Sequence, residues 1–256
     1  MPDLYLGNKI LKKNIKAILF DKDGTLIDIH KYWYSMIRLR SEFIVKKCFT
    51  NHKDKNKVKI ELMKIMGVDY EHERMKPEGP VGVKPRDFII SLTNQAINTM
   101  GGKSTINFVA KIFNDVDEYS ELHLKEFVVL LPGVKEFLEK LKKHKVSANI
   151  VSTDLTNRAK KSMKILGLSC FFDNIFGGDS VKNAKPSSEI AELVISKTGL
   201  YPRDVAVIGD HPVDILMGEN ASIDLCIAVC NGISPRDVFK ELHCEVVNDL
   251  FSLDIR

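Results

Sequence analysis

Short apolar runs alternate with longer amphipathic segments along the C-terminal half of the chain. The apolar runs predict strands at 146–151, near 175–176, and at 205–208, 225–229 and 244–247. The amphipathic segments predict helices at 135–143, 157–166, 188–198 and 212–220. Strands that alternate with helices form βαβ units, and the parallel sheet they build has both faces covered. The pattern therefore predicts the α/β class with a doubly wound parallel sheet.

The N-terminal part contains one further apolar run, at 18–20, which predicts another strand of the same sheet. The stretch after it is too long for a loop and shows helical periodicity, with no clear strand. The helices predicted in this stretch are 32–48, 58–66, 86–100 and 106–119. We therefore expect a sheet domain made of residues 1–28 and 131–256, interrupted by an inserted helical domain at 29–130.

The composition is that of an ordinary globular protein. Of the 256 residues, 44% are hydrophobic, which supplies enough apolar surface for a full core. The net charge of +4 is too small to indicate a nucleic-acid partner. No apolar run approaches the length of about 18–20 residues that crosses a membrane. Residues 1–14 lack the apolar stretch of a signal peptide, so we expect a cytoplasmic protein without membrane contact.

The cysteines form no CxxC pair and no Cys/His spacing typical of a zinc site. They are Cys48, Cys170, Cys226, Cys230 and Cys244. Two of them, Cys226 and Cys230, lie in an apolar, strand-like run. We therefore expect the cysteines to be small buried side chains in a reducing compartment.

Two carboxylates directly follow the first strand of the predicted sheet. Asp21 and Asp23 come after the apolar run at 18–20, and Gly24 and Thr25 follow them. In α/β folds, ligands bind at the carboxyl edge of the parallel sheet, where these acids emerge. Acids in this place serve as nucleophiles, transfer protons or bind a metal. The alternative is a helix N-cap with a neighbouring turn carboxylate, which involves no chemistry.

Three further polar segments stand at the ends of predicted strands or at the start of a helix. They contain Ser152 and Thr153, Lys185, and Asp210 and Asp214. Because the carboxyl ends of parallel strands share one edge, we expect these segments to converge with the first. Carboxylates gathered without a cation raise one another's pKa, and a hard divalent ion such as Mg²⁺ relieves that repulsion. A lysine and a hydroxyl beside them suit phosphoryl transfer, whereas dinucleotide redox chemistry is disfavoured because no GxGxxG follows a strand.

These four segments match a known set of motifs, in the same order. The chain has an apolar strand before DxDGT at 21–25, an apolar strand ending in Ser152, Lys185 before a proline, and GDxxxD at 209–214. On these residues the chain resembles the haloacid dehalogenase superfamily, and within it the phosphatases similar to phosphoglycolate phosphatase. The resemblance covers residues 15–230. It implies a Rossmann-like core with an inserted helical cap.

The resemblance also implies a role for each motif residue. Asp21 would be the nucleophile that forms an aspartyl-phosphate, and Asp23 would be the general acid and base. Lys185 would neutralise charge on the nucleophile and the phosphate, and Ser152 would bind the transferred group. Thr153 is a further phosphate-binding candidate, although it or Asp154 could instead cap the next helix. The metal ligands implied are Asp21, Asp23 through its backbone carbonyl, Asp210 and, as a supporting ligand or partner, Asp214.

The acid at position 23 points to phosphate esters or phosphosugar transfer, because the dehalogenases of the superfamily have no acid there. We expect a Mg²⁺-dependent phosphatase that hydrolyses a small phosphorylated metabolite. One alternative is a phosphosugar mutase of the β-phosphoglucomutase type. The other is a catalytically silent binding or regulatory protein on the same fold. His211 is expected to occupy a variable motif position without a catalytic role.

Overall fold

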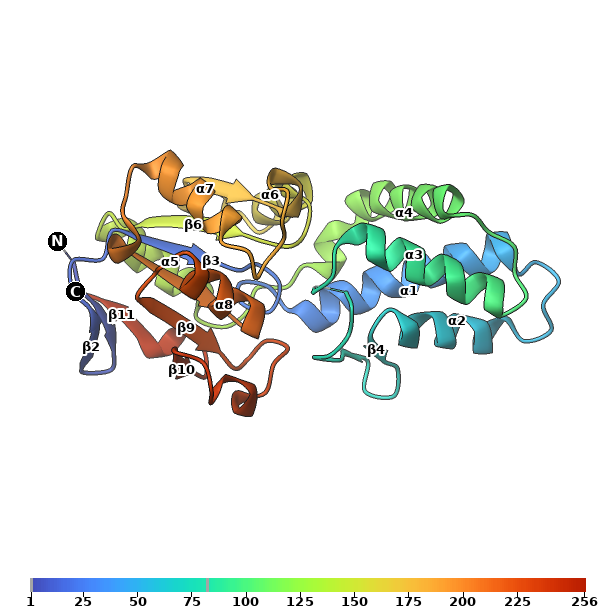
Figure 1. The fold of residues 1–256 in the computed structure, drawn as a ribbon, viewed down its shortest axis with the longest axis horizontal. Coiled ribbons are helices and arrows are strands. Elements are labelled where there is room, and N and C mark those ends of the chain that lie inside the picture. Colours follow the sequence, from blue (N-terminus) through green and yellow to red (C-terminus); the bar gives the residue numbers. More distant parts are fainter. Residues whose placement is uncertain (1, 82) are drawn as a thin grey trace. The chain divides into compact units, whose positions relative to one another are not determined.

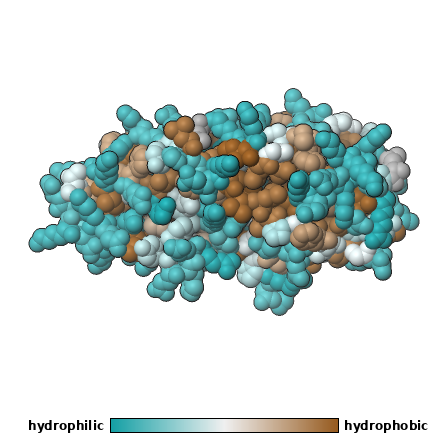
Figure 2. Space-filling view, turned by 180° about the vertical axis from the view of Figure 1, so that it is seen from behind, coloured by the Kyte–Doolittle hydropathy of each residue, from teal (hydrophilic) through white to brown (hydrophobic). Residues whose placement is uncertain are grey.

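The structure is a computed structural model that describes residues 2–81 and 83–256, so Met1 and Gly82 lie outside the described residues. The chain divides into two compact units. The sheet unit consists of Met1–Asp28 and Val129–Arg256, and the helical unit consists of Ile29–Val128. Hydrophilic residues cover most of the face drawn in Figure 2. No helix in the described part of the chain is long and apolar enough to cross a membrane.

The sheet unit is built on a parallel sheet with the strand order β10-β9-β8-β3-β6-β7 (Figure 1). The strands are β3 (Ala17–Phe20), β6 (Ser147–Val151), β7 (Asn174–Phe176), β8 (Val205–Gly209), β9 (Leu225–Val229) and β10 (Glu245–Val247). All residues of β3, β8 and β9 are buried, as in a sheet covered on both faces. This architecture confirms the predicted α/β fold.

The order in which the chain visits the strands creates a switch point beside β3. After β3 the chain moves to β6 and β7 on one side, and it then crosses to β8, β9 and β10 on the other. Ligands of open α/β sheets bind outside the carboxyl ends of the strands at such a switch point. Phe20 of β3 is in register with Ile150 and Ile208, so the residues that follow β3, β6 and β8 emerge side by side.

Helices cover both faces of this sheet. On one face, apolar side chains of α7 (Glu189–Thr198) and α8 (Pro212–Asn220) pack with alternate residues of the strands, including Leu19 and Val207. On the other, the ring of Phe20 makes edge-to-face contacts with Phe137 and Phe172, at centroid distances of 6.2 and 6.4 Å. Phe137 belongs to α5 (Val134–Lys143). The connection after β6 is α6 (Thr156–Ile165).

The predicted strands and helices of this unit are present, but a second sheet is also present that was not predicted. It is antiparallel, with the order β11-β1-β2, and it joins β1 (Leu4–Leu6), β2 (Lys9–Lys12) and β11 (Leu253–Ile255). Leu4 pairs with Ile255, which brings the two ends of the described chain together (Figure 1). These strands are too short for a reliable pattern, and pairing across the length of the chain leaves no local signal.

The helical unit consists of α1 (Ile29–Cys48), α2 (Lys55–Ile65), α3 (Arg86–Thr99) and α4 (Ile106–Phe127), with a small hairpin of β4 (Val68–Asp69) and β5 (Arg74–Met75). The prediction that this stretch has no strand is therefore wrong, because strands of two residues show no periodicity. The predicted end of the last helix at residue 119 is also wrong. Leu124 and Phe127 continue its buried face for two more turns.

All the cysteines are free. Cys226 is buried, and Cys48, Cys230 and Cys244 are partly buried. Cys170 is exposed, so the prediction that the cysteines are buried is wrong at this position. It belongs to the short 3-10 helix Ser169–Phe171, in which no residue is buried.

The packing around Phe20 gives a stability prediction. Phe137→Ala removes a ring that is only 1% exposed, and we expect it to lower the free energy of unfolding by about 3–5 kcal/mol. Phe251→Ala is the matched control, because that ring is 58% exposed, and it should cost about 1 kcal/mol or less. Urea denaturation followed by circular dichroism measures both losses. Equal losses would contradict the assigned core.

Candidate active site

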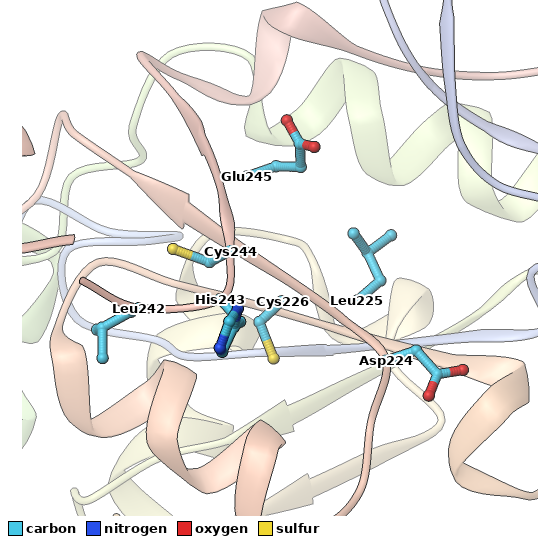
Figure 3. Close-up of a pocket in the computed structure, with 7 residues that line it drawn as sticks. All are labelled: Asp224, Leu225, Cys226, Leu242, His243, Cys244 and Glu245. Atoms are coloured by element: carbon cyan, nitrogen blue, oxygen red, sulfur yellow. The ribbon is translucent and has the colours of Figure 1, made fainter. Parts of the chain in front are cut away.

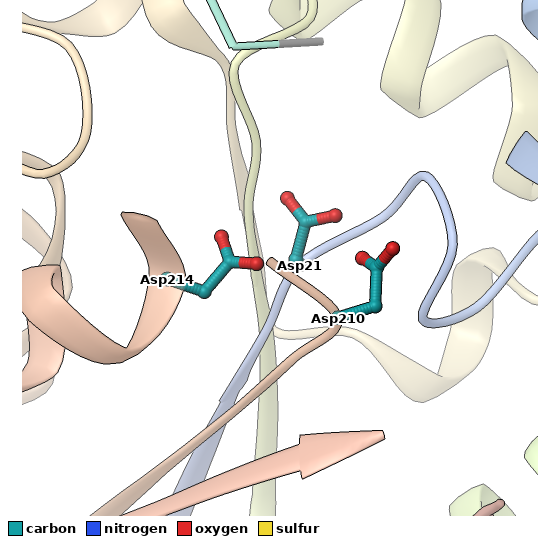
Figure 4. A group of neighbouring side chains, drawn as sticks. All are labelled: Asp21, Asp210 and Asp214. Carbon is teal, nitrogen blue, oxygen red and sulfur yellow. The ribbon is translucent and has the colours of Figure 1, made fainter. Parts of the chain in front are cut away.

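Three carboxylates gather at the switch point of the sheet. Asp21 follows β3, Asp210 follows the neighbouring β8, and Asp214 lies in the first turn of α8. Figure 4 shows their carboxylates turned toward one another. One oxygen from each lies within 4.8 Å of the others, and all three residues are buried. Such a group can hold a metal ion, and its oxygen ligands are of the kind that Mg²⁺ takes.

Lys185 holds two of these carboxylates. Its Nζ donates to Oδ1 of Asp21 at 2.7 Å and to Oδ1 of Asp214 at 2.6 Å. Its side chain is 1% exposed. The lysine lies in the segment before α7, far from both acids in sequence. The fold therefore brings together the four predicted residues Asp21, Lys185, Asp210 and Asp214.

Asp210 is fixed by donors from two loops. The hydroxyl of Thr25 donates to its Oδ1 at 3.2 Å, and the backbone N–H of Ile233 donates to its Oδ2 at 2.8 Å. Gly24, at φ +96°, and Gly232 pass so close to Asp210 that a Cβ on either would overlap its carboxylate. Gly232 and Ile233 were not among the residues predicted for the site. The only available signal was a glycine shortly after the strand at 225–229.

The buried charges shift one another's pKa. Burial raises the pKa of Asp21 to about 7, Lys185 opposes the shift, and Asp214 and Asp23 add to it. Burial, together with Asp21 and Asp214, also raises the pKa of Asp210 well above its usual value. Burial alone would lower the pKa of Lys185, but the two carboxylates outweigh it, so the lysine stays protonated. One lysine among three carboxylates leaves the group short of positive charge.

The remaining candidates lie around this group. Ser152 follows β6, is 1% exposed, and accepts the backbone N–H of Asp154 at 3.1 Å through its hydroxyl oxygen. A hydroxyl that accepts one hydrogen bond still carries a hydrogen to donate. Thr153 is only partly buried, in the loop beside Ser152. Their phosphate-binding roles stay predictions.

The side chain of Asp23 is not part of the three-carboxylate group, so its predicted share in metal binding rests on its backbone carbonyl. Its Oδ1 accepts a hydrogen bond from Lys22 Nζ at 2.5 Å. Lys22 is completely buried and also pairs with Asp154 at 3.1 Å. Lys22 occupies the unspecified position of DxDGT at 21–25 and was not among the predicted site residues, because an isolated lysine after a strand carries no specific signal.

His211 has a structural role at the start of α8. Its Nδ1 accepts the backbone N–H of Val213 at 3.3 Å, and its own backbone N–H donates to Oδ2 of Asp214 at 3.0 Å. This reciprocal arrangement is a capping box at the start of α8. It fixes Asp214, whose other oxygen accepts from Lys185. Asp214 is thus placed to support Lys185.

A pocket elsewhere in the sheet unit is not lined by Asp21, Asp210 or Asp214. It has a volume of about 370 Å³ and lies where β9 and β10 begin, at the amino edge of the sheet (Figure 3). The residues that line it are Asp224, Leu225, Cys226, Leu242, His243, Cys244 and Glu245. The acids described above emerge at the opposite, carboxyl edge.

Comparisons with solved structures agree with this fold. A predicted phosphoglycolate phosphatase from Haemophilus somnus 129PT superposes with a TM-score of 0.71 at 19% identity, covering 93% of this chain and 96% of that one. A β-phosphoglucomutase from Clostridium difficile superposes with a TM-score of 0.64 at 18% identity, covering 92% of each chain. At these identities the likeness shows the fold alone.

Comparison with known sequences identifies the family as well as the fold. The pyrophosphatase PpaX of Oceanobacillus iheyensis is 25% identical over 246 residues, which span 91% of this chain and 92% of that protein. Other PpaX proteins are matched over only about half of their own length. The family model for haloacid dehalogenase-like hydrolases matches residues 15–222. The chain therefore belongs to the family of haloacid dehalogenase-like hydrolases.

Proposed function

We propose that this hydrolase is a Mg²⁺-dependent phosphatase that cleaves a small phosphorylated metabolite through an aspartyl-phosphate on Asp21. The observation that supports it most is the Asp21 carboxylate itself. It lies at the switch point, bound to a buried lysine and grouped with Asp210 and Asp214. The phosphatase names of relatives such as PpaX point the same way.

The chemistry takes two steps. A carboxylate oxygen of Asp21 forms a bond to phosphorus while the ester P–O bond breaks, and Asp23 gives its proton to the departing oxygen. A water molecule then attacks the phosphorus of the aspartyl-phosphate and passes a proton back to Asp23. The bond between phosphorus and Asp21 breaks, inorganic phosphate leaves, and both acids return to their starting states.

Lys185 and Ser152 serve the anionic group during both steps. Lys185 stays protonated because of its two carboxylate partners, so its charge is available to the phosphoryl oxygens and to Asp21. Ser152 stands at the end of the strand next to β3, with a hydroxyl hydrogen to donate. Asp214 holds Lys185 in place from the opposite side.

The donor set fits a hard divalent cation. Oxygen ligands surround the position, and burial together with the neighbouring carboxylates raises the pKa of Asp21 and of Asp210, a cost that a bound cation would relieve. Asp21, Asp210 and the backbone carbonyl of Asp23 would hold Mg²⁺, with Asp214 in support. When bound, Mg²⁺ neutralises charge on the transferred phosphoryl group.

Two other activities remain to be separated from this one. PpaX is named a pyrophosphatase, so the leaving group could be phosphate in place of an alcohol. A phosphosugar mutase would keep the same acids and return the phosphoryl group to a sugar. A catalytically silent protein is disfavoured because Asp21, Lys185 and Asp210 are all present and in contact or close together.

Replacing the nucleophile tests the mechanism. Asp21→Asn keeps the size of the side chain but removes its nucleophilic carboxylate, so Mg²⁺-dependent release of phosphate should fall by at least about 10³-fold. Asp237→Asn is the control, because that carboxylate is largely exposed and pairs with Lys240, three residues further along the chain. Colorimetric phosphate detection measures both. Full activity in Asp21→Asn would rule out the aspartyl-phosphate.

The pKa of Asp21 gives a prediction for metal binding. The folded-state pKa of about 7 lies above the ordinary 3.8, so without a cation the site loses stability as the pH rises through this range. Mg²⁺ binds the deprotonated carboxylates, so it should raise the thermal unfolding midpoint more at about pH 8 than at about pH 5.5. Asp210→Asn should reduce the shift at the higher pH. A larger shift at the lower pH would contradict the assigned ligands.

A substrate panel separates the remaining activities. With Mg²⁺, we expect phosphate to be released from alkyl and sugar monoesters faster than from pyrophosphate. Phosphate release is followed colorimetrically, and conversion between sugar phosphates is followed by ³¹P NMR. Faster turnover of pyrophosphate would assign the PpaX activity, and sugar phosphate interconversion with little free phosphate would assign the mutase.

A further inference from the structure

A buried lysine lies between the two acids of the first motif. The side chain of Lys22 is completely buried, although lysine is almost never fully buried unless it is paired. Its Nζ donates to Oδ1 of Asp23 at 2.5 Å and lies 3.1 Å from Oδ2 of Asp154. A buried ammonium group needs such partners, because otherwise its desolvation is uncompensated.

Asp154, the second partner of Lys22, is itself held by several contacts. Its Oδ1 accepts the backbone N–H of Leu155 at 2.8 Å and pairs with Nη1 of Arg158 at 3.1 Å. Burial would raise the pKa of Asp154, but Arg158 and Lys22 more than offset this and lower it, so the carboxylate stays charged. Asp154 also donates its backbone N–H to the hydroxyl of Ser152. One residue is thus bonded to both the lysine and the predicted phosphate-binding serine.

The ion pair between Lys22 and Asp154 is not needed to neutralise Asp154, which suggests that Lys22 has a role beyond stabilising the fold. Arg158 already gives Asp154 a buried counter-ion, so Lys22 is not required to neutralise it. A buried apolar side chain would avoid the desolvation of an ammonium group and could pack in the same space. Lys22 also donates to Asp23, the predicted acid and base, at 2.5 Å.

We propose that Lys22 is a positioning residue for Asp23, held in place by Asp154; this rests on the proposed function. Lys22 binds Oδ1 of Asp23 and so fixes the rotation of the carboxyl group. The other oxygen, Oδ2, then carries the proton that moves to the leaving oxygen as the ester P–O bond breaks. In the second step Oδ2 takes a proton from the attacking water. Lys22 exchanges no proton in either step.

The test compares two phosphate esters that differ in their need for an acid. The leaving group of p-nitrophenyl phosphate is stable as an anion, whereas the alkoxide of an alkyl monoester requires a proton as it leaves. Lys22→Met keeps the length of the side chain but removes its charge. We expect kcat for the alkyl ester to fall about tenfold further than kcat for the aryl ester, with KM for both within about twofold of wild type.

Two further variants complete the experiment. Lys16→Met is the matched control, because Lys16 pairs with Asp204 at 3.0 Å just before β3, at the other end of the same strand. It should leave the ratio of the two kcat values unchanged. Asp154→Asn releases the anchor of Lys22 and should shift the ratio in the same direction. Because Lys22 and Asp154 act together, the double variant should shift it no further than Lys22→Met alone.

The outcomes are distinct. Equal losses for both esters, no loss, or failure of both Lys22→Met and Asp154→Asn to fold by circular dichroism would overturn the positioning role. If only Lys22→Met fails to fold, the ratio of the two kcat values in Asp154→Asn tests the positioning role, and an unchanged ratio would overturn it. Wild-type protein that hydrolyses neither ester with Mg²⁺ would overturn the proposed function and this inference together. Active wild-type protein with an unchanged ratio in Lys22→Met would overturn this inference alone.

Discussion

Several carboxylates are buried together at one edge of the parallel sheet, and the surrounding loops are arranged to stabilise them. Asp21, Asp210 and Asp214 lie close together and out of water, which is unfavourable unless positive charge is present. Lys185 supplies part of it and bonds to two of the three. Thr25 and the backbone of Ile233 fix Asp210 with neutral donors. The remaining deficit of positive charge is what makes this edge suited to a cation.

The same strand end carries a second buried network of lysine, arginine and carboxyl groups. Lys22 lies between Asp23 and Asp154, and Arg158 pairs with Asp154. The two networks are joined through the backbone, because Asp21, Lys22 and Asp23 are consecutive. The first network contains one lysine among three carboxylates, whereas in the second a lysine and an arginine both pair with Asp154. This difference is consistent with different roles: the network of Asp21, Asp210 and Asp214 is suited to binding a ligand, and the network around Lys22 fixes the positions of its own side chains.

Much of the sheet unit was predictable from the sequence because its strands are buried on both faces. The runs at 205–208 and 225–229 are continuous and apolar, and they became β8 and β9. The antiparallel sheet of β1, β2 and β11 was not predictable, because it forms between opposite ends of the chain. The hairpin of β4 and β5 was missed because its strands have two residues each. The end of α4 was placed too early although Leu124 and Phe127 continue its apolar spacing.

The α/β class, the family and the acids at the ends of β3 and β8 could be read from the sequence, because strand burial and short motifs are local properties. Tertiary structure alone decided which groups those acids meet. Lys185 reaches Asp21, and Ile233 reaches Asp210, only because the switch point brings distant loops together. Lys22 shows the limit most clearly. In the sequence it is the unspecified residue of DxDGT, and only the tertiary structure shows that it is buried between Asp23 and Asp154.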